Sequence, residues 1–463
     1  MQPPVRHETT KETEASEGTT IGSSNGQTDW KEPPSWLPPT FHALAYRNYV
    51  LLWLGQISNS LSMWMDLVAR PALVVAMTGS AVQLGLIALV RGLPMTVLAP
   101  FAGVLADRID RRILMLISKV ASLVITTGFS ALILTGNVEL WHVYVTAILR
   151  SLAMAFDQPA RQALLPTLVP PKLLVNAVAL NMGSMQVVRI LSATVAGFLI
   201  AGWAVAFGFG EHDTRAFGGV YLLGAITYII AVICTYILRV PPEGQVARTE
   251  DSWFTSMAEG FRFARRQPVI LGILALFGVQ SLFGMSLNQV FVPWLALEVM
   301  DVGYAGMGLL LAASGIGAVI GSLVLATYGA RLRHRGLIIL GGLAVMGLAV
   351  AGLGVTSVLP VVTVMGVMVA VLPSLMIIFA GLGQAAMTTL KNAVLLEVTP
   401  NELRGRVFSI QSLDRAFSTI GGAMGGFTIA LIGGPMAVTV FGVLLVMGTI
   451  GVGAKTSTLR KYD

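Results

Sequence analysis

The sequence is poor in charged residues. Asp, Glu, Lys and Arg together make up 11% of its 463 residues, and apolar residues make up 55%, whereas a typical soluble protein carries about 25% charged residues. So few charges cannot cover the surface of a soluble protein of this length. The composition therefore indicates an integral membrane protein rather than a soluble enzyme or binding domain.

Cysteine is almost absent, and several common motifs are missing. The one cysteine, Cys234, lies in an apolar run, so an intrachain disulfide is excluded and we interpret the thiol as a small buried apolar group. No phosphate-binding loop ending in Gly-Lys-Ser or Gly-Lys-Thr occurs, and the five histidines are scattered. We therefore expect no direct drive by ATP, no enzyme activity, no cofactor and no metal site.

Long apolar runs fill the chain after a polar beginning. A helix needs about 20 apolar residues to cross a hydrocarbon core about 30 Å thick, and twelve segments meet this requirement. We expect transmembrane helices near 50–77, 82–104, 113–135, 140–160, 176–206, 217–238, 269–297, 304–328, 336–356, 360–388, 406–432 and 435–453.

The apolar runs fall into two groups of six. Residues 1–40 are predicted to be a disordered cytoplasmic tail rather than a signal peptide. We expect an N-terminal six-helix bundle at 41–238, a cytoplasmic linker at 239–268, a C-terminal six-helix bundle at 269–456 and a short tail at 457–463. Aromatic and basic residues are interleaved in the linker, which is either an amphipathic surface helix or a solvated connection.

Basic residues occur in every second loop. Lys and Arg concentrate on the cytoplasmic side of membrane proteins. This alternation therefore predicts a multi-pass protein of the cell (inner) membrane with both termini in the cytoplasm. It also explains the net charge of +7, which in a soluble protein would suggest nucleic acid as a partner. Only Arg215 falls in an opposite loop. The cytoplasmic set comprises Arg108, Arg111, Arg112, Arg161, Lys172, Arg239, Arg248, Arg262, Arg265, Arg266, Arg331, Arg333, Arg335, Lys391, Arg404 and Arg406.

The two halves share short sequences. The segment VPPKLLVNA from Val169 resembles TPNELRGRV from Thr399, about 230 residues later, and the small-residue runs at 192–197 and 421–426 also match. Chance similarity between small-residue helices is the alternative for the second match. Parallel six-helix repeats are typical of one class of transporter.

The segment GVLADRIDRR follows the second predicted helix and contains Gly103, Asp107, Arg108, Arg111 and Arg112. It resembles the signature loop of the major facilitator superfamily. There, an acid at the inner end of helix 2 latches the two halves together on the cytoplasmic side by charge-assisted hydrogen bonds and by facing a helix N-terminus. The alternative is that these residues are ordinary topology charges.

Three further segments narrow the resemblance: residues 77–108, 156–170 and 176–191. They are similar to the branch of bacterial facilitators that includes the enterobactin exporter and drug-efflux proteins. The resemblance implies an all-α integral membrane fold with about twelve transmembrane helices in two pseudo-symmetric six-helix bundles, a monomer that transports a small molecule.

The sequence departs from the family pattern at three places. Asp110 replaces the usual Gly of the signature loop. Ser192-Ala193 replaces a Gly-Pro pair often found on helix 5 of antiporters, and the equivalent loop at 329–335 has no acid that matches Asp107. We therefore expect an asymmetric latch.

Charged residues inside the predicted membrane helices are costly and are functional candidates, and we single out seven of them. Asp66 and Arg70 are four residues apart and can pair on one helix face. The resemblance implies that helices 1, 4, 7 and 10 line the cavity, so that Asp66, Arg70 and Arg150 face the pathway. For Arg91, Arg189 and Arg415 a structural role is an equal alternative. The candidate substrate-binding or coupling residues are Asp66, Arg70, Arg91, Arg150, Arg189, Asp414 and Arg415.

Five arginines against two aspartates leave an excess of cations, which favours a substrate with an acidic group. We therefore expect a secondary active transporter, a proton-driven exporter of a small amphiphilic or anionic molecule that is siderophore-like or drug-like. Asp66 and Asp414 are the expected proton carriers, because a buried carboxylate can bind a proton near neutral pH. The alternatives are a lipid or lysolipid translocator of the same fold and a non-transporting sensor or scaffold.

Overall fold

The computed structural model describes most of the chain. The described residues are 33–34, 36–106, 109–210, 213–240, 261–262, 265, 267–328, 334–364, 367–399 and 413–460. Most of the expected N-terminal tail and linker, and Asp107 and Arg108 of the expected latch, lie outside these residues. The boundaries of the tail and the linker therefore stay predictions.

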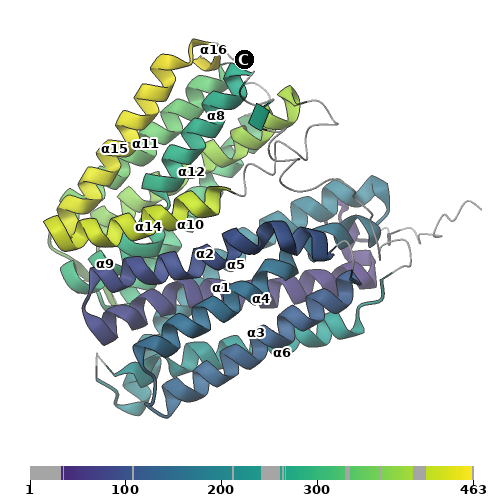
Figure 1. Cartoon of the computed structure of the whole chain (residues 1–463), viewed down its shortest axis with the longest axis horizontal. Helices are drawn as coiled ribbons and strands as arrows, with labels where there is room; N and C mark the ends of the chain where they lie inside the picture. Colours follow the sequence, from purple (N-terminus) through teal and green to yellow (C-terminus); the bar gives the residue numbers. More distant parts are fainter. Residues whose placement is uncertain are drawn as a thin grey trace, which may run out of the picture.

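The N-terminal half is a bundle of six long helices (Figure 1). Its core contains large buried side chains such as Leu73, Phe129 and Tyr221. Gly79 and Gly208 end the first and fifth helices in the left-handed conformation, with φ of 54° and 68°, which glycine adopts without steric cost. The helices are α1 (Arg47–Thr78), α2 (Ala81–Ala106), α3 (Arg111–Leu134), α4 (Leu140–Leu164), α5 (Leu174–Phe207) and α6 (Gly218–Ile237).

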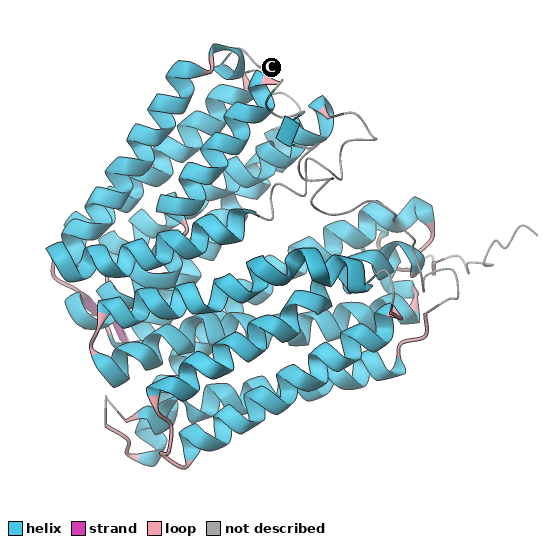
Figure 2. Cartoon of the chain, in the orientation of Figure 1, coloured by secondary structure: helices cyan, strands magenta, loops and turns pink. Residues whose placement is uncertain are grey.

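The C-terminal half repeats this architecture (Figure 2). Its first span is a composite helix in which π-helical segments interrupt the α-helix: α8 (Pro268–Val279), η6 (Gln280–Gly284), η7 (Leu287–Phe291), α9 (Val292–Trp294) and η8 (Leu295–Val299). The following helices are α10 (Gly303–Tyr328), α11 (Arg335–Thr356), α12 (Val371–Val398), α14 (Leu413–Ile432), α15 (Gly434–Lys455) and the short α16 (Ser457–Arg460).

The helix predicted at 360–388 is wrong at both ends. A small antiparallel hairpin, β1 (Val362–Val364) and β2 (Val367–Val369), precedes α12. The helix then begins at Val371 and continues to Val398. The valines of the hairpin are apolar enough for a membrane helix, but their β-branched side chains fit a strand well.

Eleven helical segments of the described residues are long and apolar enough to cross a membrane. The twelfth, α4, has 25 residues but carries Arg150, Asp157 and Arg161, which reduce its hydropathy. It packs between α2 and α3. The expected all-α membrane fold of about twelve helices in two six-helix bundles is therefore confirmed.

The two bundles meet at one end and diverge toward the other, which we call the terminal side because α1 begins there and α15 ends there (Figure 1). At the opposite, closed side, α2 packs against α14 and α5 against α10. Glycines form both contacts: a Cβ added to Gly85 would lie 3.0 Å from the Cα of Gly426, and one added to Gly197 would lie 2.9 Å from the Cα of Gly308. The matching small-residue runs of the two halves thus lie in these two helix contacts, which we call the glycine seams.

Candidate functional site

A cavity of about 410 Å³ lies between the two bundles, and we call it the central cavity. Residues of α1, α2, α4 and α5 line it on one side, and residues of η7 and α14 on the other. Its charged lining residues are Arg91, Asp157, Arg161 and Arg415. Three cations against one acid make this cavity suitable for an anionic group.

Arg91 and Arg415 provide cationic groups at the wall of the central cavity. Among the described residues, neither guanidinium forms an ion pair with a carboxylate. Arg415 donates a short hydrogen bond to Gln158 Oε1 and so connects α14 with α4 across the cavity. Because Arg stays protonated, each of these side chains favours an anionic partner.

A second, narrower space of about 250 Å³ adjoins the first, and we call it the side cavity. It shares Leu67 and Gln289 with the central cavity. Trp64 and Arg189 line it from the N-terminal bundle, and Met285 and Gln384 line it from the C-terminal bundle. Arg189 donates a hydrogen bond to Ser314 Oγ on α10 (3.1 Å) and so also bridges the bundles.

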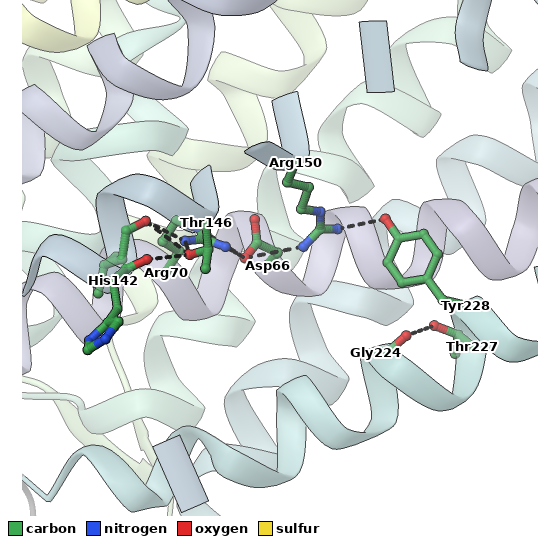
Figure 3. A network of polar contacts seen from close by, with 9 residues as sticks. Asp66, Arg70, His142, Thr146, Arg150, Gly224, Thr227 and Tyr228 are labelled. Atoms are coloured by element: carbon green, nitrogen blue, oxygen red, sulfur yellow. Dashed lines mark hydrogen bonds and ion pairs between the residues drawn. The ribbon is translucent and has the colours of Figure 1, made fainter. Parts of the chain in front are cut away.

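Asp66 is the centre of an ion-pair network inside the N-terminal bundle (Figure 3). Its Oδ1 lies 2.8 Å from Arg70 Nη2 and 3.3 Å from Arg150 Nη1. Arg70 also donates to the carbonyl of Val143 (2.8 Å), and Arg150 donates to the hydroxyl of Tyr228 (3.2 Å). The pairing of Asp66 with Arg70 that their spacing predicts is therefore present.

This network lies behind the cavity wall. Asp66, Arg70 and Arg150 are 3%, 2% and 4% exposed. Asp66 and Arg150 line neither the central cavity nor the side cavity, and Arg70 lines a small cavity of about 20 Å³. The expectation that these three side chains face the pathway is therefore not met in this conformation, and their role in coupling stays a proposal.

Comparison with known proteins decides the family. The family described as Major Facilitator Superfamily matches residues 52–410, which is most of the chain. The protein belongs to the major facilitator superfamily. This facilitator is 26% identical to the macrolide efflux protein A of Streptococcus pyogenes over 312 residues, which cover 66% of this chain and 73% of the relative.

Two further similarities extend over more of the chain. The facilitator is 26% identical to the enterobactin exporter EntS of Salmonella choleraesuis over 400 residues, covering 86% of this chain and 88% of that one. The crystal structure of the nucleoside transporter NupG superposes with a TM-score of 0.63 at 14% identity, covering 92% of this chain and 100% of that one. The sequence relatives are thus exporters by name, and the solved structure shows the fold.

Asp414 and Arg415 are neighbours on α14 but have different partners. Asp414 accepts a short hydrogen bond from Ser281 within the C-terminal bundle, while Arg415 binds Gln158 of the other bundle. The two side chains form no ion pair with each other among the described residues. Arg415 therefore contacts the opposite bundle, whereas Asp414 contacts its own bundle.

Asp157, an acidic residue that lines the facilitator's central cavity, is not among the predicted site residues. Its carboxylate lies 3.8 Å from Lys119 Nζ and 3.7 Å from Arg161 Nε, and all three side chains are largely buried. The four-residue spacing of Asp157 and Arg161 was a signal for this pair. It was overlooked because Arg161 was assigned to a loop, whereas α4 extends to Leu164.

Lys391 was also assigned to a loop, and this assignment is wrong. It lies within α12, is 3% exposed, and its Nζ is 3.3 Å from the centroid of the Phe277 ring. A cation over an aromatic ring is stabilised by the ring quadrupole. Lys391 therefore contributes to the interior of the C-terminal bundle rather than to the topology signal.

Part of the expected latch can be placed. Gly103 lies in α2, and Asp107 and Arg108 lie outside the described residues. Arg111 donates to the carbonyl of Ala163 (3.5 Å), and Arg112 donates to backbone carbonyls at the end of α6. Asp110 caps α3 by accepting from the backbone N–H groups of Arg112 and Ile113. The departure from glycine at Asp110 thus gives α3 a capping residue.

Proposed function

We propose that this facilitator is a secondary active exporter that binds a small amphiphilic or anionic molecule in the central cavity and releases it by alternating access. The observation that carries the proposal is the position of that cavity between two bundles that meet at the closed side and diverge at the terminal side. In this class of transporter, one repeat rocks against the other around a site near the middle of the membrane. The guanidinium groups of Arg91 and Arg415, which form no ion pair among the described residues, support an acidic substrate.

Export is supported by the relatives and by the predicted topology. Macrolide efflux protein A and the enterobactin exporter are both exporters by name. The loop charges predict that the protein lies in the cell membrane with both termini in the cytoplasm. On this topology, the terminal side faces the cytoplasm. The conformation described here then accepts a substrate from inside the cell.

We further propose that protons drive the cycle. Asp66 shares its carboxylate between Arg70 and Arg150 on different helices, so its protonation would weaken contacts between α1 and α4. Asp414 is the corresponding candidate in the C-terminal bundle, where it holds Ser281. Conversion of a shared buried charge into a neutral group is a physical route from proton binding to helix movement.

Transport into everted membrane vesicles tests this proposal. Vesicles with the full chain should take up a radiolabelled macrolide or enterobactin faster than vesicles without it, and a protonophore should abolish the difference. Uptake that persists undiminished with the protonophore would contradict proton coupling. Equal uptake with and without the protein would contradict transport of these two probes by this chain.

A further inference from the structure

We propose that the side cavity is a charge-selective subsite that binds a compact organic monoanion, with Arg189 as the anion-binding residue. The inference deepens the proposed function, because it names the substrate class and the residue that selects it. It rests on the chain being a transporter of small molecules. The test measures ligand binding without a proton gradient and without transport. Failure of the side-cavity proposal can therefore be distinguished from failure of proton-driven export.

The first reason is that Arg189 has no anionic partner in the part of the chain that the structure describes. It lies in the middle of α5, and no carboxylate of the described residues forms an ion pair with it. A guanidinium at this depth in a membrane is costly unless it is paired or faces a polar cavity. A bound anion would supply the missing charge.

The second reason is that Arg189 is held in position. It donates to Ser314 Oγ (3.1 Å), and its guanidinium carbon lies 5.3 Å from the Trp64 ring centroid. Ser314 Oγ is a neutral acceptor and takes up one N–H group, so most of the five N–H donors of the guanidinium are left for a ligand. Because a hydroxyl and an aromatic ring already orient this guanidinium, it can bind a carboxylate with little further loss of side-chain entropy.

The third reason is the rest of the lining. Leu67, Val68, Ala193 and Leu311 give the cavity an apolar wall, which fits an apolar or aromatic body. Apolar walls with a few convergent polar groups are typical of small-molecule sites.

Polar groups of the lining are incompletely bonded among the described residues. Asn288 Oδ1 and Trp64 Nε1 are buried and have no hydrogen-bond partner. The amide of Gln384 donates to the sulfur of Met285 (3.3 Å), which is a weak acceptor. Asn288 lies in η7, and π-helical turns are frequent at functional sites. These groups would hold the polar end of a ligand next to Arg189.

The test uses three ligands with the same aromatic body and different charge. Isothermal titration calorimetry of the purified full chain in detergent compares 2-naphthoate, methyl 2-naphthoate and protonated 2-naphthylmethylamine. We expect naphthoate to bind about 10- to 100-fold more tightly than the ester, since one charge-assisted hydrogen bond accounts for a factor of this size. The cation should bind most weakly.

Matched variants locate the effect. Arg189→Gln should remove the preference for naphthoate, and this variant is expected to fold because it removes an unpaired buried charge. Arg215→Gln, which removes an exposed arginine that lines neither cavity, should keep the preference. Leu311→Phe narrows the side cavity without touching the charge, and should weaken naphthoate and its ester equally.

Equal affinity of the wild-type protein for all three ligands would overturn the proposal. A preference that survives in Arg189→Gln would overturn it too, because the anion would then bind at another site. Thermal melting of each variant in detergent shows whether a loss of binding has come from unfolding. If Arg189→Gln does not fold, Leu311→Phe decides: unchanged naphthoate binding there contradicts the side cavity as the site.

Discussion

At the scale of single residues, charge balance distinguishes two kinds of arginine in this facilitator. Arg70 and Arg150 share the carboxylate of Asp66 inside one bundle, whereas Arg91 and Arg189 line cavities without an ion pair to a described residue. We propose that the first kind stabilises the bundle and that the second kind attracts an anion. The spacing of Asp66 and Arg70 predicted one ion pair, but the approach of Arg150 depends on how α4 packs and could not be predicted.

Asp66→Asn tests the structural part of this distinction. The substitution leaves two buried guanidinium groups without their shared anion, and removal of one partner of a buried pair costs about 3–5 kcal/mol. We expect a clearly lower thermal midpoint in detergent. Asp213→Asn is the matched control, because Asp213 pairs with Arg215 in an exposed loop, and there the midpoint should hardly change. Equal midpoints for the two variants would contradict a stabilising network.

Asp157 allows a test by compensation. Asp157→Asn leaves the buried Lys119, 3.8 Å away, without its carboxylate, and we expect a loss of stability of a few kcal/mol, as for other broken buried pairs. Adding Lys119→Met removes the uncompensated cation, so the double variant should be more stable than Asp157→Asn alone. Additive losses measured by thermal melting would show that the two side chains do not interact.

At the scale of helices, apolar length predicted where most spans lie, because a helix in lipid must satisfy its backbone internally over the whole thickness. The same rule could not separate the valine hairpin at 362–369 from the start of α12, since both are apolar. Nor could it predict which face of α5 meets α10. Lining residues of the side cavity such as Asn288 and Gln384 carry no charge, and only tertiary packing brings them together.

The glycine seams give a prediction at this scale. A side chain at Gly197 would collide with α10, since its Cβ would lie 2.5 Å from the carbonyl oxygen of Tyr304. Overpacking costs about 1–3 kcal/mol, which shifts the equilibrium away from this conformation by about 5- to 150-fold. We expect Gly197→Val to open the closed side, measured as a longer spin-label distance there. A Cβ added to Gly202 on the same helix has nothing within 4 Å, so Gly202→Val should leave the distance unchanged.

At the scale of the whole molecule, two similar halves meet through equivalent helices, α2 with α14 and α5 with α10. The sequence repeat predicted the two halves. It could not predict which side of the molecule is closed, because one sequence serves every state of a transport cycle. The latch expected from Asp107 concerns the opposite state and stays a prediction.

Asp107→Asn tests that latch. The substitution keeps the size of the side chain and removes its charge, and each lost charge-assisted bond is worth about 1.5–3 kcal/mol. The population open at the terminal side should therefore rise by about 10- to 150-fold relative to the state closed there, with slower transport and little change in ligand affinity. An unchanged distance distribution together with wild-type transport would mean that these residues only direct topology.

Double electron–electron resonance on the full chain in lipid nanodiscs tests alternating access most directly. In a Cys234→Ser background, one label pair joins Ile113→Cys with Leu337→Cys at the terminal ends of α3 and α11. The second pair joins Trp141→Cys with Val355→Cys at the closed side, and all four positions are exposed. The account predicts two populations for each pair. A change between acidic and neutral pH should shift these populations, so that the terminal distances shorten as the closed-side distances lengthen. One fixed distance for each pair under all conditions would contradict alternating access and favour a non-transporting sensor or scaffold.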